Sequence, residues 1–146
     1  MNVARVVAAG VAATVWDSIY GFSVYGILLA PEFEKYPNVY RSAEVGPSYL
    51  PLMFAGILVA MIAAAFIYAK GYEGGSGVAE GARFGFLLAV FVNFVFVGVN
   101  YATLNIGKRI TVMLAAAGFF EWLMAGIVIG VVYKTDAGAA RKRAAV

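Results

Sequence analysis

The chain contains no cysteine and no histidine. Disulfide bonds, thiolate chemistry, Cys/His zinc sites and histidine-ligated haem are therefore excluded. Charged residues are also scarce, because they make up 13% of the 146 residues while apolar residues make up 63%. Soluble domains have about 25% charged and about 45–50% apolar residues. These deviations exclude a soluble globular domain, a disordered chain and a collagen-like chain, and they indicate an integral membrane protein.

Sequence motifs of common enzyme classes are missing as well. The chain has no GxGxxG or GxxxxGK[ST] phosphate-binding loop and no GxSxG nucleophile elbow. No general base of suitable strength accompanies the hydroxyl-bearing residues near the acidic groups. We therefore expect a protein that is not an enzyme and that binds no metal and no cofactor.

Four apolar runs are long enough to cross a bilayer, which requires about 20 residues in a helix. They cover residues 6–29, 49–68, 84–106 and 110–133. Too few residues remain outside these runs to build a soluble domain. We predict a single integral membrane domain over residues 1–146, with an all-α fold that is a four-helix transmembrane bundle.

The three connections between the runs differ in composition. Residues 31–48 contain prolines, which prevent a long helix, beside aromatic residues, and we expect this segment to lie along the membrane surface. The glycine-rich residues 69–83 are typical of a flexible loop. Residues 107–109 are so few that the last two helices must form a tight antiparallel hairpin.

Lysine and arginine residues stand at the ends of the apolar runs and give the chain a net charge of +3. This distribution is typical of topology signals, and we expect no nucleic-acid partner. With four spans, the side of the termini has seven basic residues, including Arg141, Lys142 and Arg143, and the other side has four. The positive-inside rule then predicts a multi-pass protein of the bacterial inner membrane, surrounded by lipid, with both termini in the cytoplasm.

The first and the last run each contain one acidic residue near the centre. Asp17 lies in the middle of residues 6–29, and Glu121 lies in the middle of residues 110–133. An acidic side chain at the bilayer midplane costs roughly 2.5–3.5 kcal/mol on insertion scales, so it must face the bundle interior or a watery cavity. Because none of the four runs supplies a basic counter-charge, we expect at least one of the two carboxyl groups to be protonated at rest.

Other polar residues are predicted to accompany the two acids. Asn93 and Asn100 are seven residues apart in the third run and therefore share a helix face, and Tyr20 lies one turn from Asp17. In one interpretation these five residues form a proton-binding site, as in many proton-coupled transporters. In the other, Asp17 and Glu121 share a proton and hydrogen bond with Asn93 or Tyr20 only to hold the bundle together.

Small residues indicate close contacts between helices. Gly10 and Gly21 belong to a small and polar stripe of the first run, together with Thr14, Asp17, Tyr20 and Tyr25. Gly126 and Gly130 form the segment GIVIG, and Gly81 forms a similar GARFG segment with the glycine four residues later. Such spacing favours helix pairing, either within the bundle or between copies in a homo-oligomer.

Three segments, WDSIYG (16–21), LLAPEFEKYPNVYRSAE (28–44) and EGARFGF (80–86), resemble a family of small, uncharacterised bacterial membrane proteins. The resemblance implies four spans, an acidic residue in the first span and an aromatic, arginine-containing first loop. It implies no ligand and no reaction. Many members have a histidine where this chain has Tyr20, so the resemblance does not imply a histidine-dependent role here.

Two functions are compatible with these observations. The first is an accessory protein that associates in the membrane, as a homo-oligomer or in a larger membrane complex, because a small bundle without a soluble domain requires partners. The second is a proton-coupled transporter or exporter in which Asp17 and Glu121 exchange protons for a cationic or lipophilic substrate. Since four short helices enclose little space, we expect a transport pathway to need more than one chain, and we rank association first.

Overall fold

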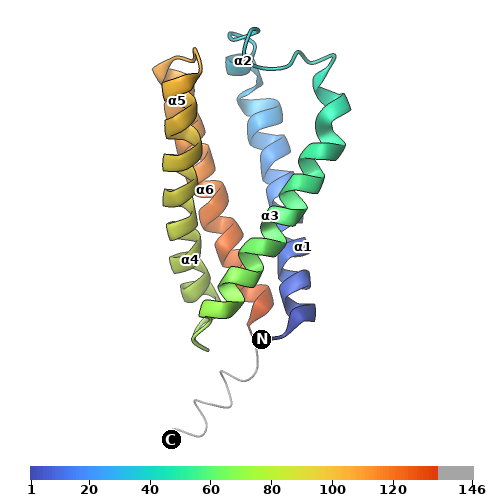
Figure 1. Cartoon of the computed structure of the whole chain (residues 1–146), viewed down its shortest axis with the longest axis vertical. Helices are drawn as coiled ribbons and strands as arrows, with labels where there is room; N and C mark the ends of the chain where they lie inside the picture. The colour runs from blue at the N-terminus through green and yellow to red at the C-terminus, as the bar shows by residue number, and fades with distance from the viewer. Residues whose placement is uncertain (135–146) are drawn as a thin grey trace, which may run out of the picture.

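Figure 1 shows a computed structural model of the chain, which describes residues 1–134. Four of its helices are long and apolar enough to cross a membrane: Val3–Leu28, Gly46–Gly71, Gly77–Thr103 and Lys108–Tyr133. No strand occurs within residues 1–134. The predicted all-α fold with four membrane-spanning helices is therefore confirmed. Arg141, Lys142 and Arg143 lie outside the described residues.

Several of these spans consist of more than one helical element. In chain order the elements are α1 (Val3–Gly21), the π-helix η1 (Phe22–Leu28), α2 (Ala30–Phe33), the 3₁₀ turn η2 (Gly46–Tyr49), α3 (Leu50–Gly71), α4 (Gly77–Val92), the π-helix η3 (Asn93–Gly98), α5 (Val99–Thr103) and α6 (Lys108–Tyr133). The first span thus changes from α to π geometry at Phe22, and the third changes at Asn93. Only the last span is a single uninterrupted helix.

Helix α6 lies at the centre of the bundle. It packs against α4 and against α1, while α3 packs chiefly against α1 (Figure 1). The first and the last span are therefore neighbours, although they come from opposite ends of the described chain. This arrangement places Asp17 of α1 and Glu121 of α6 on adjoining helices.

The closest approach between two helices is that of α4 and α6, and it depends on glycine. A Cβ atom on Gly81 would lie 2.5 Å from the carbonyl oxygen of Gly126, and one on Gly77 would lie 2.5 Å from that of Gly130. The GARFG and GIVIG segments therefore pair with each other inside one chain. Gly10 has the same role between α1 and α3, where an added Cβ would lie 2.7 Å from the Cα of Ile62.

A buried core closes the end of the bundle that holds the N-terminus. It joins three helices through α1 residues Val6, Ala9 and Ala13, α3 residues Met61, Ala64, Ala65 and Tyr68, and α6 residues Ala125, Ile129 and Tyr133. The rings of Tyr68 and Tyr133 meet edge to face, with their centroids 5.9 Å apart. The three helices are therefore held firmly together at this end.

At the opposite end, which we call the loop end, α3 diverges from the other helices (Figure 1). Ten of its residues, 50–60 apart from Ile57, are exposed around the whole circumference of the helix. Leu52 and Val59, for example, expose 72% and 68% of their surface. In a membrane, this half of α3 faces lipid or another protein.

The connection between the second and third spans differs from the predicted flexible loop of residues 69–83. Helix α4 begins at Gly77, so only residues 72–76 lie outside helices. The carboxylate of Glu80 accepts hydrogen bonds from the backbone N–H groups of Glu73 and Gly75, which holds this short connection on the first turn of α4. Packing of the α4 glycines against α6 compensates for their poor helix propensity. The hairpin before α6 is as tight as predicted, because residues 104–107 alone connect α5 to α6.

Candidate binding site at the acid pair

Asp17 and Glu121 meet at the centre of the contact between α1 and α6. Only 6% of Asp17 and 8% of Glu121 is exposed, and the two side chains are close enough for each carboxyl group to act on the other. Both residues lie within two positions of the midpoint of their spans. Ionised carboxylates are acceptors only, so the two groups can hydrogen bond to each other only when at least one of them is protonated.

Side chains of the first span donate hydrogen bonds to the carboxyl group and to the backbone carbonyl of Glu121. The hydroxyl group of Tyr25 donates to Oε2 of Glu121 at 2.8 Å. The indole N–H of Trp16 donates to the backbone carbonyl of Glu121 at 3.4 Å. Tyr20, which we expected beside the acids, instead donates to the backbone carbonyl of Ala117 at 3.0 Å. Tyr20 therefore fastens α1 to α6, and Tyr25 is the tyrosine that contacts the acid pair.

The position of Tyr25 depends on the π-helix η1. On a regular α-helix, a residue eight positions after Asp17 is rotated by about 80° from it. A π-helix has more residues in each turn, which rotates Tyr25 back towards the face of Asp17. Sequence reasoning placed Tyr25 on the same small and polar stripe as Asp17 but did not single it out as a residue of the site.

Asn93, the first residue of η3, presents an unpaired acceptor to the same site. Its Nδ2 donates to the carbonyl of Ala89 at 2.8 Å, whereas its buried Oδ1 accepts no hydrogen bond within residues 1–134. A Cβ atom on Gly118 would lie 3.9 Å from this Oδ1 and 3.8 Å from the hydroxyl oxygen of Tyr25. The missing side chain of Gly118 therefore gives both groups room beside the backbone of α6.

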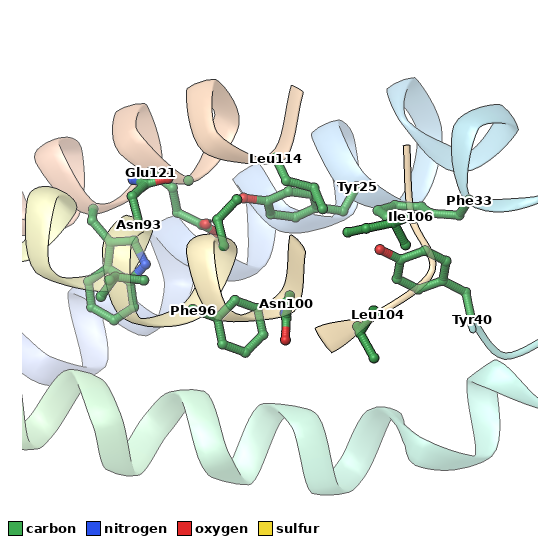
Figure 2. A pocket seen from close by; sticks show the side chains of 14 residues that line it. Tyr25, Phe33, Tyr40, Asn93, Phe96, Asn100, Leu104, Ile106, Leu114 and Glu121 are labelled. Carbon is green, nitrogen blue, oxygen red and sulfur yellow. Dashed lines mark hydrogen bonds between the residues drawn. The ribbon is translucent and has the colours of Figure 1, made fainter. Parts of the chain in front are cut away.

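A cavity of about 440 Å³ extends from Glu121 and Asn93 towards the loop end (Figure 2). Asn100, seven residues after Asn93, also lines the cavity but does not contact the acid pair. The remaining wall is apolar or aromatic and includes Phe33, Tyr40, Phe96, Ile106, Leu114 and Trp122. Glu121 is the only charged residue of the lining, and Asp17 lies behind it. The cavity thus has an acidic inner end and a largely apolar body.

Two π-helical segments contribute to opposite parts of this cavity. Tyr25 belongs to η1, while Asn93, Phe96 and Val97 belong to η3. A π turn is rare within helices, costs regular hydrogen bonding and is frequent at functional sites. The two segments therefore make the cavity the candidate functional site of the bundle.

The first connection covers the loop end of the cavity. Phe33 and Tyr40 line the cavity and stack edge to face, with ring centroids 4.7 Å apart. The hydroxyl oxygen of Tyr36 accepts a hydrogen bond from the backbone N–H of Gly107 at 3.1 Å. Glu32 forms ion pairs with Lys35 and, across to the start of α6, with Arg109 at 3.1 Å. These contacts hold the connection over the hairpin between α5 and α6.

The ion pairs of Glu32 make the attachment of the first connection to the start of α6 dependent on pH. The hydrogen bond from Lys35, opposed by burial and reinforced by the charge of Arg109, holds the pKa of the Glu32 carboxyl below its ordinary 4.5. Because the pKa is lowered in the folded state, the stabilisation is fully present above pH 4.5 and disappears as the pH falls through the lowered value.

We predict that Glu32→Gln lowers the thermal unfolding midpoint of the purified protein at pH 7, and that the difference from the wild type vanishes in strong acid. The control is Glu34→Gln, since Glu34 is exposed on the same connection and has no ion pair within residues 1–134. If Glu32→Gln lowered the unfolding midpoint equally at every pH, or by no more than Glu34→Gln does, the role given to these ion pairs would be contradicted.

Comparison of the chain with protein-family models, with curated proteins and with solved structures finds no match. What the chain does must therefore be inferred from the geometry of the cavity and the acid pair.

Proposed function

We propose that the chain is a proton-linked membrane carrier for a cationic, lipophilic molecule. The observation that supports this most directly is the position of Glu121, beside Asp17, at the inner end of a largely apolar cavity. A cation that reaches Glu121 competes with the proton for the same carboxylate. Ionisable groups buried at the membrane midplane are expensive and are characteristic of proton relays in transporters.

The exchange balances in charge. When the acid pair holds both of its protons, the inner end of the cavity is neutral. One proton leaves Glu121 as one monovalent cation binds, and the inner end stays neutral. Tyr25 keeps its hydrogen bond to Glu121 in either state, because the carboxyl group still has a free acceptor lone pair.

We place the termini in the cytoplasm of a bacterium and the loop end on the outer side of its inner membrane. Seven lysine and arginine residues on the side of the termini, against four on the other, support this orientation. The cavity then leads from the membrane midplane towards the outer surface, where the first connection covers it. The proposed membership of a small four-span bacterial family is compatible with this placement.

Residues of a single chain line the cavity, which is partly open and which no residue of α3 lines. The proposed binding step therefore does not require a second chain. For this reason transport now ranks above association. That a complete transport pathway needs more than one chain stays a prediction.

Association with a second copy is the other proposal, and it is supported by the exposed half of α3, residues 50–60. Gly126 and Gly130 no longer support it, because they pack against α4. The test is the native mass of the protein after gentle extraction from its own membranes. We predict two chains in each particle, and a particle of one chain without other polypeptides would contradict association.

The transport proposal is tested with purified protein in sealed lipid vesicles that carry a pH gradient and no other driving force. The probes are two lipophilic cations: ethidium, whose amino groups carry N–H donors, and tetraphenylphosphonium, which has no N–H group. The proposal predicts that the protein moves at least one probe against its gradient and dissipates the pH gradient faster than in vesicles without protein. If neither probe moves and the pH gradient persists, the proposal is wrong.

A further inference from the structure

We propose that the ligand of the cavity carries a protonated amine with N–H groups on an apolar body, rather than a quaternary ammonium or an acidic head group. This inference rests on the proposed function and adds the chemistry of the head group. It follows from three features of the cavity, namely its charge, its free hydrogen-bonding capacity and the nature of its walls.

The charge of the lining excludes an acidic head group. Among residues 1–134, Glu121 is the only acidic residue of the lining, and no lysine or arginine side chain lines the cavity. An anion would therefore lie beside a carboxyl group in an apolar space without a counter-charge, which is strongly unfavourable. A cation, in contrast, neutralises Glu121 as the proton leaves.

The buried polar atom that lacks a partner at the inner end is an acceptor. Oδ1 of Asn93 is buried and unpaired, and the carboxyl group of Glu121 has lone pairs beyond the one that Tyr25 uses. The Tyr25 hydroxyl hydrogen and one amide hydrogen of Asn93 already have partners in Glu121 and Ala89. A head group with several N–H donors satisfies these acceptors, whereas a quaternary ammonium leaves Oδ1 of Asn93 unpaired.

The walls suit an apolar body that extends from the head group towards the loop end. Phe96, Leu114 and Ile106 follow one another in this direction from Glu121 (Figure 2). A volume of about 440 Å³ lies within the range of about 300–1,000 Å³ that is typical of small-molecule pockets. The ligand class is therefore an amphiphilic primary or secondary amine.

The test compares three compounds with the same ten-carbon chain: decylamine, decyltrimethylammonium and decanoate. Binding is measured at pH 7 on the protein in lipid nanodiscs by tryptophan fluorescence. Both tryptophans of the chain report on the site, because Trp122 lines the cavity and Trp16 donates to Glu121. Nanodiscs without protein correct for the partition of each compound into lipid.

We expect decylamine to bind at least about tenfold more tightly than decyltrimethylammonium, since hydrogen bonds from charged donors to buried acceptors are worth that factor or more. Decanoate should not bind. Asn93→Leu should reduce the preference for the amine to less than about threefold, because the buried acceptor is gone. The matched control is Asn100→Leu, which changes the same cavity away from the acid pair and should keep the preference.

Equal affinity of the wild type for the two cations, or tighter binding of decanoate, would overturn the inference. This comparison uses the wild type alone, so it remains decisive even if Asn93→Leu does not fold. Transport of tetraphenylphosphonium in vesicles would then still support the proposed function. Absence of binding for all three compounds, together with absence of transport, would contradict both proposals.

Discussion

Glu121→Gln is expected to lower the affinity for a lipophilic cation about 10- to 150-fold and to abolish the coupling of its transport to protons. The variant removes the only charged group of the cavity lining. A hydrogen bond to a charged group contributes about 1.5–3 kcal/mol, and about 1.4 kcal/mol corresponds to a factor of ten in affinity. The amide is nearly the same size and can still accept the hydrogen bond from Tyr25, so the bundle should fold.

Asp17→Asn tests the second member of the acid pair separately. Asp17 does not line the cavity, so we expect cation binding to persist while proton-coupled transport is lost. Transport in vesicles is the measurement for both variants, and Glu44→Gln, an exposed acid of the first connection, is the control. If both variants transport ethidium and protons like the wild type, the acid pair is structural and the transport proposal fails.

Gly126→Leu is expected to destabilise the protein by about 3 kcal/mol or more, at or beyond the upper end of ordinary overpacking. An added side chain would meet the backbone of α4, including the carbonyl oxygen of Gly81 at 2.7 Å. Backbone atoms of a packed helix cannot move aside as a flexible side chain can, so α4 would have to separate from α6. Asn93 would move with it, and the binding site would be lost together with the fold.

The measurement is the free energy of unfolding in mixed detergent micelles. Gly56→Leu is the matched control, because Gly56 lies in the exposed half of α3 and an added Cβ there meets nothing within 4 Å. The control should unfold like the wild type. Equal stability of the two variants would mean that α4 and α6 do not cross at these glycines.

The spans and the acid pair could be predicted from the sequence because membrane insertion depends on local hydropathy and depth. An acid in the middle of an apolar run has few acceptable environments, so Asp17 and Glu121 had to face the interior. That they meet each other was beyond prediction, since it depends on α6 being the neighbour of α1. The same tertiary information decides that Gly126 pairs with α4 of its own chain.

Two further features were missed because local sequence rules pointed elsewhere. The glycines at the start of α4 have low helix propensity, yet tertiary contact with α6 makes Gly77 the first residue of a helix. Tyr20 and Tyr25 belong to the same polar stripe of the first run, and only the packed structure shows that Tyr25, rather than Tyr20, donates to the carboxyl group of Glu121. The unpaired oxygen of Asn93 could be recognised only from the packed structure.

The exchange of a proton for a cation at Glu121 is tested most directly by counting the protons that ethidium releases when it binds. The purified protein is titrated with ethidium by calorimetry in two buffers of different ionisation enthalpy, at a pH where the wild type binds it. We predict the release of about one proton for each ethidium bound by the wild type, and none for Glu121→Gln at concentrations that saturate it. Binding of ethidium to the wild type without proton release would contradict the exchange.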